Sequence, residues 1–153
     1  MTKVLLLAFL VAFSSCETFG LNVLNGDFNT LLKSSANLVD GSCNFLGASN
    51  NNAIYGNGNQ LAYSNANTVA GNQNHLECSN GNLAVGSGNS FYGSNGNVNV
   101  GNGNGYVNAN NNFVAGNGNL LAAANCNTVA GQGNSLYNTN GNFVYGQGNL
   151  IAN

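Results

Sequence analysis

The stretch NTVAGNQNHLECSNG, residues 67–81, contains the repeating unit that decides the fold. Each half of it begins with asparagine, at Asn67 and Asn74, and has a hydrophobic residue two positions later, at Val69 and Leu76. The same arrangement returns every 15 residues along most of the chain. A fixed period with two similar halves is typical of a solenoid, in which one structural unit stacks on its copies.

Two series of asparagines mark the start of these half-units without a gap. The first series is Asn22, Asn37, Asn52, Asn67, Asn82, Asn97, Asn112, Asn127 and Asn142. The second series, seven residues further along, is Asn29, Asn44, Asn59, Asn74, Asn89, Asn104, Asn119, Asn134 and Asn149. The nine repeats predict nine coils that each contribute two short strands.

The bulk composition, taken without the repeat, is that of a disordered chain. Of 153 residues, 36 are asparagine and 22 are glycine, only 4% are charged and none is proline. Such polar, low-complexity sequences are usually disordered. Here, however, hydrophobic residues recur in a fixed register, and period-two alternation turns them inward together with the anchor asparagines. We therefore expect an ordered array.

Two layers of inward side chains form the expected core. In the first half-units they are Leu24, Val39, Ile54, Val69, Ala84, Asn99, Val114, Val129 and Val144. In the second half-units they are Leu31, Leu46, Leu61, Leu76, Phe91, Tyr106, Leu121, Leu136 and Ile151. We expect the two members of each coil to match in volume. We also expect the Asn99 amide to bond the Tyr106 hydroxyl, because an unpaired buried amide is costly.

Glycine follows every first-series anchor by four residues, as at Gly71. Glycine is favoured where a tight bend requires positive φ. The resulting prediction is an all-β protein, a parallel β-solenoid or β-roll of nine 15-residue coils from about residue 20 to residue 153. Two short parallel sheets, with strands of about four or five residues, enclose inward asparagine ladders and a Val/Leu core.

The N-terminal segment, residues 1–16, has the features of a secretory signal peptide. A lysine precedes an apolar run, residues 4–13, which is too short to span a bilayer, and small residues suit cleavage after Cys16. A bacterial lipoprotein box around Cys16 is the weaker alternative, because Phe13 stands where an aliphatic residue is usual. We expect a secreted, extracellular chain whose residues 17–153 form a single β-roll domain.

The charge balance argues against several kinds of partner. Beyond residues 1–16, four carboxylates face a single cation, Lys33. A chain with one cation offers no electrostatic footprint for nucleic acid or for an anionic membrane surface. Repeated calcium sites need an aspartate in every turn, and this chain has two aspartates. We expect no nucleic acid, membrane or metal partner, and no cofactor.

We expect no enzymatic activity. The single histidine, His75, lies two residues from Glu77, and both point outward from one predicted strand. The pair could act as acid and base or bind a metal, but no third ligand or cleft accompanies it. We interpret these two side chains as solvated surface residues. The many Gly-x-Gly pairs are interpreted as turn glycines, because no helix follows them.

Three cysteines, Cys43, Cys78 and Cys126, remain beyond the signal segment. Cys43 falls at one bend and the other two at the opposite bend, about three coils apart, which is beyond the reach of a disulfide. We therefore expect no intramolecular bridge. The cysteines are interpreted as small apolar turn residues, and an intermolecular crosslink is the alternative.

The half-units resemble the N-x-V-x-G heptad of the ice-binding, recrystallisation-inhibiting β-roll of ryegrass and related grasses. The sequence NTVAG at 67–71 and 127–131 fits that motif, and NFVAG at 112–116 nearly repeats it. The resemblance covers residues 22–153. It implies a left-handed roll with a Val core and Asn ladders, in which one flat face binds ice. A looser similarity to the SVAIG-type repeats of trimeric adhesin heads is not accompanied by a coiled-coil stalk.

The outward positions depart from the ryegrass-type pattern, which carries Thr or Ser regularly on the ice face. The side chains expected on the outer side of the first strands, called here the first face, are mainly aliphatic and aromatic. From residue 68 onward this face carries no charge and no amide: Thr68, Ala70, Leu83, Val85, Val98, Val100, Phe113, Ala115, Thr128, Ala130, Phe143 and Tyr145. The outer side of the second strands, the second face, is rougher and more polar.

These observations favour a secreted ice-binding protein that inhibits ice recrystallisation through the first face. The alternative is a self-assembling extracellular structural protein, a fibre or coat subunit. An apolar face favours pairing side by side, and a solenoid whose sequence ends directly on a strand at Asn153 favours stacking end to end. Adhesion or carbohydrate binding through exposed tyrosines is a third interpretation, and the positions concerned are Tyr55, Tyr92, Tyr137 and Tyr145.

Overall fold

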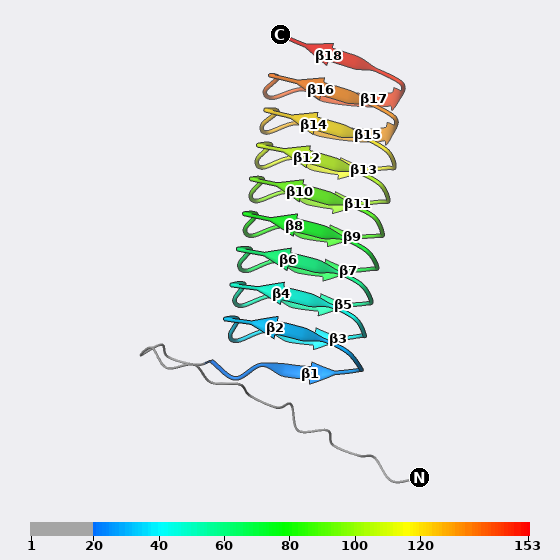
Figure 1. Ribbon diagram of the computed structural model, residues 1–153. Helices are drawn as coiled ribbons and strands as arrows, with labels where there is room; N and C mark the ends of the chain where they lie inside the picture. Colours follow the sequence, from blue (N-terminus) through cyan, green and yellow to red (C-terminus); the bar gives the residue numbers. More distant parts are fainter. Residues whose placement is uncertain (1–19) are drawn as a thin grey trace.

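The computed structural model describes residues 20–153, and the predicted signal peptide, residues 1–16, lies outside the described residues. The described chain winds into nine coils that stack along one axis (Figure 1). Each coil contributes one strand to each of two nine-stranded sheets, and all strand pairs are parallel. The predicted all-β parallel solenoid with two sheets is confirmed.

The odd-numbered strands form the first sheet and the even-numbered strands form the second. The first sheet contains β1 (Val23–Asn25), β3 (Leu38–Asp40), β5 (Ala53–Tyr55), β7 (Thr68–Ala70), β9 (Leu83–Val85), β11 (Val98–Val100), β13 (Phe113–Ala115), β15 (Thr128–Gln132) and β17 (Phe143–Gln147). The second contains β2 (Thr30–Leu32), β4 (Phe45–Gly47), β6 (Gln60–Ala62), β8 (His75–Glu77), β10 (Ser90–Tyr92), β12 (Gly105–Val107), β14 (Leu120–Ala122), β16 (Ser135–Tyr137) and β18 (Leu150–Ala152). Paired residues are 15 positions apart, so equivalent side chains form straight columns.

The strands are shorter than predicted, with three residues in most coils and five only in β15 and β17. In the first sheet a glycine follows the third residue of each three-residue strand. Gly71 has a φ of 144°, which turns the chain away from the sheet. A Cβ at Gly71 would lie 2.0 Å from the carbonyl oxygen of Gly86 in the next coil. The bend therefore begins immediately after β7, at a position where stacked backbones leave no room for a side chain.

The core consists of the two predicted layers. The inward hydrophobic residues of the inner coils, for example Val69 and Leu76, are fully buried. At the first and last coils, Leu24, Leu31 and Ile151 pack against this core and are partly buried. Most coils thus bury only two principal hydrophobic side chains, and much of the rest of the interior is polar.

The middle of the rod departs from the Val/Leu pattern in two successive coils. Ala84 is followed in its coil by Phe91, and Asn99 by Tyr106, and all four are buried. The two aromatic rings stack at a centroid distance of 4.4 Å and an interplanar angle of 5°. The Tyr106 hydroxyl donates to the Asn99 Oδ1 atom at 2.9 Å, which confirms the predicted pair. Burial raises the pKa of Tyr106 far above its ordinary value, so the phenol stays neutral.

Buried asparagine ladders run along both sheets, as predicted. The Nδ2 atom of Asn82 donates to Oδ1 of Asn67 at 3.1 Å and to the carbonyl oxygen of Ser94 at 2.8 Å. The backbone N–H of Asn82 donates to the same Oδ1 at 2.9 Å. In the second sheet, Asn74 makes the equivalent bonds to Asn59 and Gly86. Each amide therefore bonds a carbonyl oxygen in its own coil and an asparagine amide in the preceding coil.

Two further amide ladders lie outside the sheets, one on each bend, and the sequence analysis missed both. On the bend after the second sheet, the backbone N–H of Asn80 donates to Oδ1 of Asn95 at 2.8 Å, and the Asn80 Nδ2 atom donates to the same oxygen at 3.2 Å. On the opposite bend, Asn102 bonds Asn117 in the same manner. These outer ladders point toward the following coil, whereas the buried ladders point toward the preceding one.

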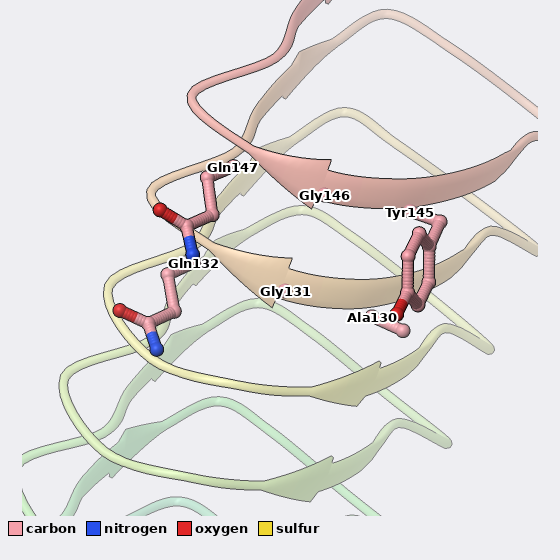
Figure 2. Close-up of a pocket in the computed structure, with 6 residues that line it drawn as sticks. All are labelled: Ala130, Gly131, Gln132, Tyr145, Gly146 and Gln147. Atoms are coloured by element: carbon pink, nitrogen blue, oxygen red, sulfur yellow. The ribbon is translucent and has the colours of Figure 1, made fainter.

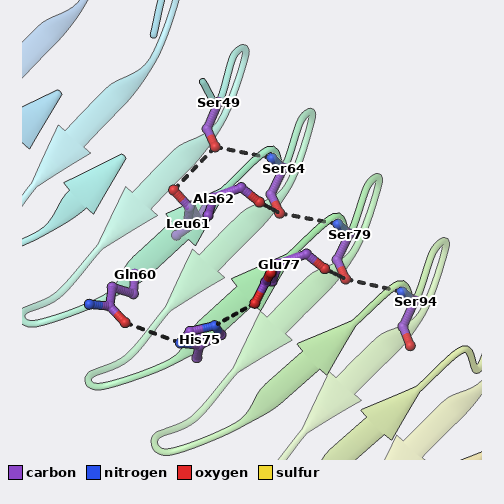
Figure 3. A network of polar contacts seen from close by, with 9 residues as sticks. All are labelled: Ser49, Gln60, Leu61, Ala62, Ser64, His75, Glu77, Ser79 and Ser94. Carbon is purple, nitrogen blue, oxygen red and sulfur yellow. Dashed lines mark hydrogen bonds and ion pairs between the residues drawn. The ribbon is translucent and has the colours of Figure 1, made fainter. Parts of the chain in front are cut away.

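A buried serine series adds a third type of ladder (Figure 3). The backbone N–H of Ser79 donates to Oγ of Ser64 at 3.1 Å, and that hydroxyl donates to the carbonyl oxygen of Ala62 at 2.9 Å. The series ends at Ser94, because the next two equivalent positions are Ala109 and Ala124, which have no hydroxyl. The following position, Thr139, has a buried Oγ1 atom without a hydrogen-bond partner. Sequence analysis did not predict these hydrogen bonds.

We expect Asn82→Ala to destabilise the rod by about 3 kcal/mol or more, because it removes two donated and two accepted buried hydrogen bonds. The matched control is Asn80→Ala, two residues away in the exposed ladder. Water can replace the lost partners there, so the loss should stay below about 1 kcal/mol. Urea unfolding followed by circular dichroism measures both, and equal losses would contradict the structural role of the buried ladder.

Completing the serine series should stabilise the protein. In the variant Ala109→Ser/Ala124→Ser, each new hydroxyl can donate to the carbonyl two residues earlier and accept from the backbone N–H of the next coil. The expected gain is about 1 kcal/mol per site, or a rise in melting temperature of roughly 2–4 °C for each. Calorimetry checks this, with Ala123→Ser on the exposed bend as a neutral control. A lower melting temperature in the double variant would show that the alanines are required for packing.

Candidate binding face

The twelve residues predicted for the first face form two straight columns on the outer side of the first sheet. The first column is Thr68, Leu83, Val98, Phe113, Thr128 and Phe143. The second column is Ala70, Val85, Val100, Ala115, Ala130 and Tyr145. None of the twelve is buried, whereas the residue between the two columns in each strand is buried. The structure thus brings the predicted residues together on one surface, and their role in binding stays a prediction.

Backbone hydrogen bonds fix the spacing of these columns. The N–H of Thr68 donates to the carbonyl oxygen of Asn82 at 2.9 Å, and the N–H of Leu83 to that of Asn97 at 2.9 Å. Neighbouring coils are therefore held at the ordinary strand spacing of about 4.8 Å. Because the same bonds recur in every coil, the outward side chains are held on a regular two-dimensional array with little freedom in the backbone.

The array is regular in its backbone but uneven in its side chains. Alanine occupies three of six positions in the second column, while Phe143 and Tyr145, the last residues of the first and second columns, are 75% and 81% exposed. Phe113 stands in the middle of the first column and is also exposed. Large rings therefore rise beside small methyl groups, and the flattest part of the face lies over β7, β9 and β11.

Charge is confined to the early coils. Within residues 20–153 the ionisable Asp, Glu, Lys and His side chains are Asp27, Lys33, Asp40, His75 and Glu77. No such side chain occurs after Glu77, so the last five coils are neutral on both faces and both bends. A surface of this kind can approach ice, a neutral polymer or another copy without desolvating an ion.

His75 and Glu77 form a small polar group on the second face (Figure 3). His75 Nδ1 lies 3.1 Å from Oε1 of Gln60, and His75 Nε2 lies 3.7 Å from Oε2 of Glu77. Both the His75 and the Glu77 side chains are well exposed, so the contact between them contributes little to stability. Within the described residues, no group of three or more His, Cys, Asp or Glu side chains could hold a metal ion.

A shallow, open depression lies at the end of the first face, between β15 and β17 (Figure 2). Six residues line it: Ala130, Gly131, Gln132, Tyr145, Gly146 and Gln147. Tyr145 stands on one side of the two glycines, and the two glutamine side chains stand on the other. Sequence analysis placed Tyr145 and Ala130 on the face but missed the glutamines, whose signal is that they replace the Asn, Ser or Asp of the other coils.

Cys43, Cys78 and Cys126 are all exposed and free. Each occupies a bend position with positive φ, between 50° and 59°. In some other coils a glycine with positive φ stands at the equivalent position, as at Gly88 for Cys43 and Gly93 for Cys78. The absence of a disulfide among these three cysteines agrees with the sequence prediction.

Because the three thiols are exposed, we expect all of them to react with a maleimide reagent in the native protein. Without reductant the protein should still run as a monomer on denaturing gels, since each thiol lies on a bend and apart from the apolar first face. Mass spectrometry of the labelled protein gives the thiol count. A covalent dimer that disappears on reduction would instead support the intermolecular crosslink.

The described residues include no helix long and apolar enough to cross a membrane. Comparison with protein-family models, with curated proteins and with solved structures gives no match to this chain. The likeness to the ryegrass-type repeat therefore rests on the motif residues at 67–71, 112–116 and 127–131.

Proposed function

We propose that this protein is secreted and binds ice through the first face, where it slows ice recrystallisation. The observation that carries the proposal is the pair of straight, uncharged columns on six neighbouring parallel strands, β7 to β17. Methyl groups and hydroxyls on such an array keep fixed mutual distances. Water above them can be ordered with little further loss of protein entropy, because the backbone is already immobile.

The same geometry supports a weak activity rather than a strong depression of the freezing point. Threonine occurs at only two of the twelve positions, Thr68 and Thr128, and rings at Phe113, Phe143 and Tyr145 interrupt the plane. A crystal plane can lie flat against only part of this surface. Inhibition of recrystallisation needs adsorption to grain boundaries and tolerates a smaller matching area than complete arrest of crystal growth.

The alternative function is assembly into an extracellular fibre or coat. A specific observation favours it: Phe143 and Tyr145 expose large apolar surfaces within a stretch that carries no charge. Two such faces could meet without burying an ion, and neutral surfaces repel each other little. Sedimentation velocity over a range of concentrations distinguishes the two functions. We expect a monomer, and concentration-dependent polymers would favour assembly.

Val100→Asp should abolish retention on ice and inhibition of recrystallisation, because it places a hydrated carboxylate in the middle of the first face. The matched control is Val107→Asp in the same coil. Val100 is 45% exposed on the first sheet and Val107 is 41% exposed on the second, so both changes add one surface charge. Both variants should fold with melting temperatures near that of the unmodified protein.

Ice-affinity purification and a splat-cooling assay measure the two activities. The unmodified protein and the Val107→Asp variant should be retained on ice and keep the grains small, whereas the Val100→Asp variant should pass through. If the unmodified protein is not retained and does not limit grain growth, the ice-binding proposal is wrong. If both variants lose activity equally, binding does not depend on the first face.

A further inference from the structure

The outer amide ladder on the bend after the first sheet stops at Gln132. In the preceding coil, Oδ1 of Asn117 accepts the backbone N–H of Asn102 at 2.8 Å and the Asn102 Nδ2 at 3.2 Å. Gln132 and Gln147 occupy the next two positions of that column. Within the described part of the chain, neither glutamine amide makes a side-chain hydrogen bond of this ladder type. The extra methylene carries each amide past the backbone N–H that an asparagine would meet.

The strands change at the same place. β15 and β17 continue for five residues, and their pairing extends through Gly131 with Gly146 and through Gln132 with Gln147. The two glutamines therefore lie side by side at the coil spacing of about 4.8 Å. Both side chains are exposed, and Figure 2 shows them projecting together from the bend. The result is a pair of parallel amides without protein partners.

The Tyr145 ring faces these amides across Gly131 and Gly146, which have no side chains. Tyr145 is 81% exposed and lines the same depression, separated from the glutamines by Gly131 and Gly146 (Figure 2). Ala130 beneath the ring adds a small methyl group. One site thus combines a flat apolar ring, two amides that each carry a donor and an acceptor, and no charge.

We propose that this depression binds a neutral pyranose ring of a polysaccharide. The axial C–H groups on one face of such a sugar can lie against the Tyr145 ring. Its neighbouring hydroxyls can accept from the Nε2 hydrogens of Gln132 and Gln147 and donate to their Oε1 atoms. A hydrocarbon ligand would leave both amides unpaired, and an ion would find no opposite charge. A neutral polyhydroxyl ring is the class that satisfies both walls at once.

The site is open, so a single sugar ring should bind with an affinity on the order of millimolar. A polysaccharide that presents many rings to many protein molecules would bind more firmly through multivalency. Sugar binding also requires the glutamines of the bend, which are outside the two columns, whereas ice binding through the columns does not; Tyr145 and Ala130 are common to both surfaces. Failure of one activity therefore leaves the other open to test.

The experiment is a titration of ¹⁵N-labelled protein with three neutral oligosaccharides: cellohexaose, chitohexaose and mannohexaose. With at least one of them, the side-chain amide signals of Gln132 and Gln147 should shift in a saturable manner. Tyr145→Ala should weaken binding roughly tenfold or more, because it removes the stacking wall. Tyr55→Ala is the matched control, since Tyr55 pairs with Ala70, the first residue of the second column, and is 44% exposed but has Asn57, a ladder residue, beside it.

A second variant, Gln132→Asn/Gln147→Asn, keeps the amide chemistry but shortens both side chains. The amide at 132 can then accept the backbone N–H of Asn117 and rejoin the ladder, so both amides become occupied. Binding should fall roughly tenfold while the melting temperature holds or rises, which separates loss of the site from loss of the fold. The assignment is wrong if none of the three sugars gives saturable shifts, or if binding survives either the tyrosine or the glutamine change.

Discussion

The stack depends on the hydrogen bond between equivalent asparagine amides in neighbouring coils. One coil buries only two principal hydrophobic side chains, such as Val69 and Leu76, which is too little to hold a 15-residue loop alone. The anchor amide of Asn82 satisfies the amide of Asn67 and a bend carbonyl at Ser94 at once. Because each buried amide finds a hydrogen-bond partner in the neighbouring coil, one coil is stable only when another is stacked against it. Buried polar residues therefore stabilise this fold alongside the small hydrophobic core.

The periodicity of the sequence was sufficient to predict the architecture, the two core layers and the buried ladders. A 15-residue period with hydrophobic residues two positions after each anchor leaves one arrangement that buries them all. The bends were less predictable, because Asn, Ser and Gly are all compatible with a turn. The folded structure shows that Asn80 and Ser79 form ladders of their own. Strand length also escaped prediction, because the 15-residue period places the strands but does not determine the residue at which each one ends.

The candidate binding face could likewise be predicted only in part. Both columns of the first face could be predicted, because alternation along a strand places residues such as Val98 and Val100 on the side opposite the core. The depression beside Tyr145 could not be predicted, because Gln132 looks like another polar turn residue. Gln132 matters because its side chain does not make the ladder hydrogen bond that an asparagine makes at this position.

The opposite directions of the buried and outer ladders have an electrical consequence. The amide of Asn82 donates toward the preceding coil, whereas that of Asn80 donates toward the following one, so their dipoles oppose each other along the rod. Backbone dipoles in a sheet also leave only a small net moment. An α-helix, by contrast, accumulates roughly half a charge at each end. Adding a coil to this rod therefore adds little to the dipole moment along its axis, whatever the length of the rod.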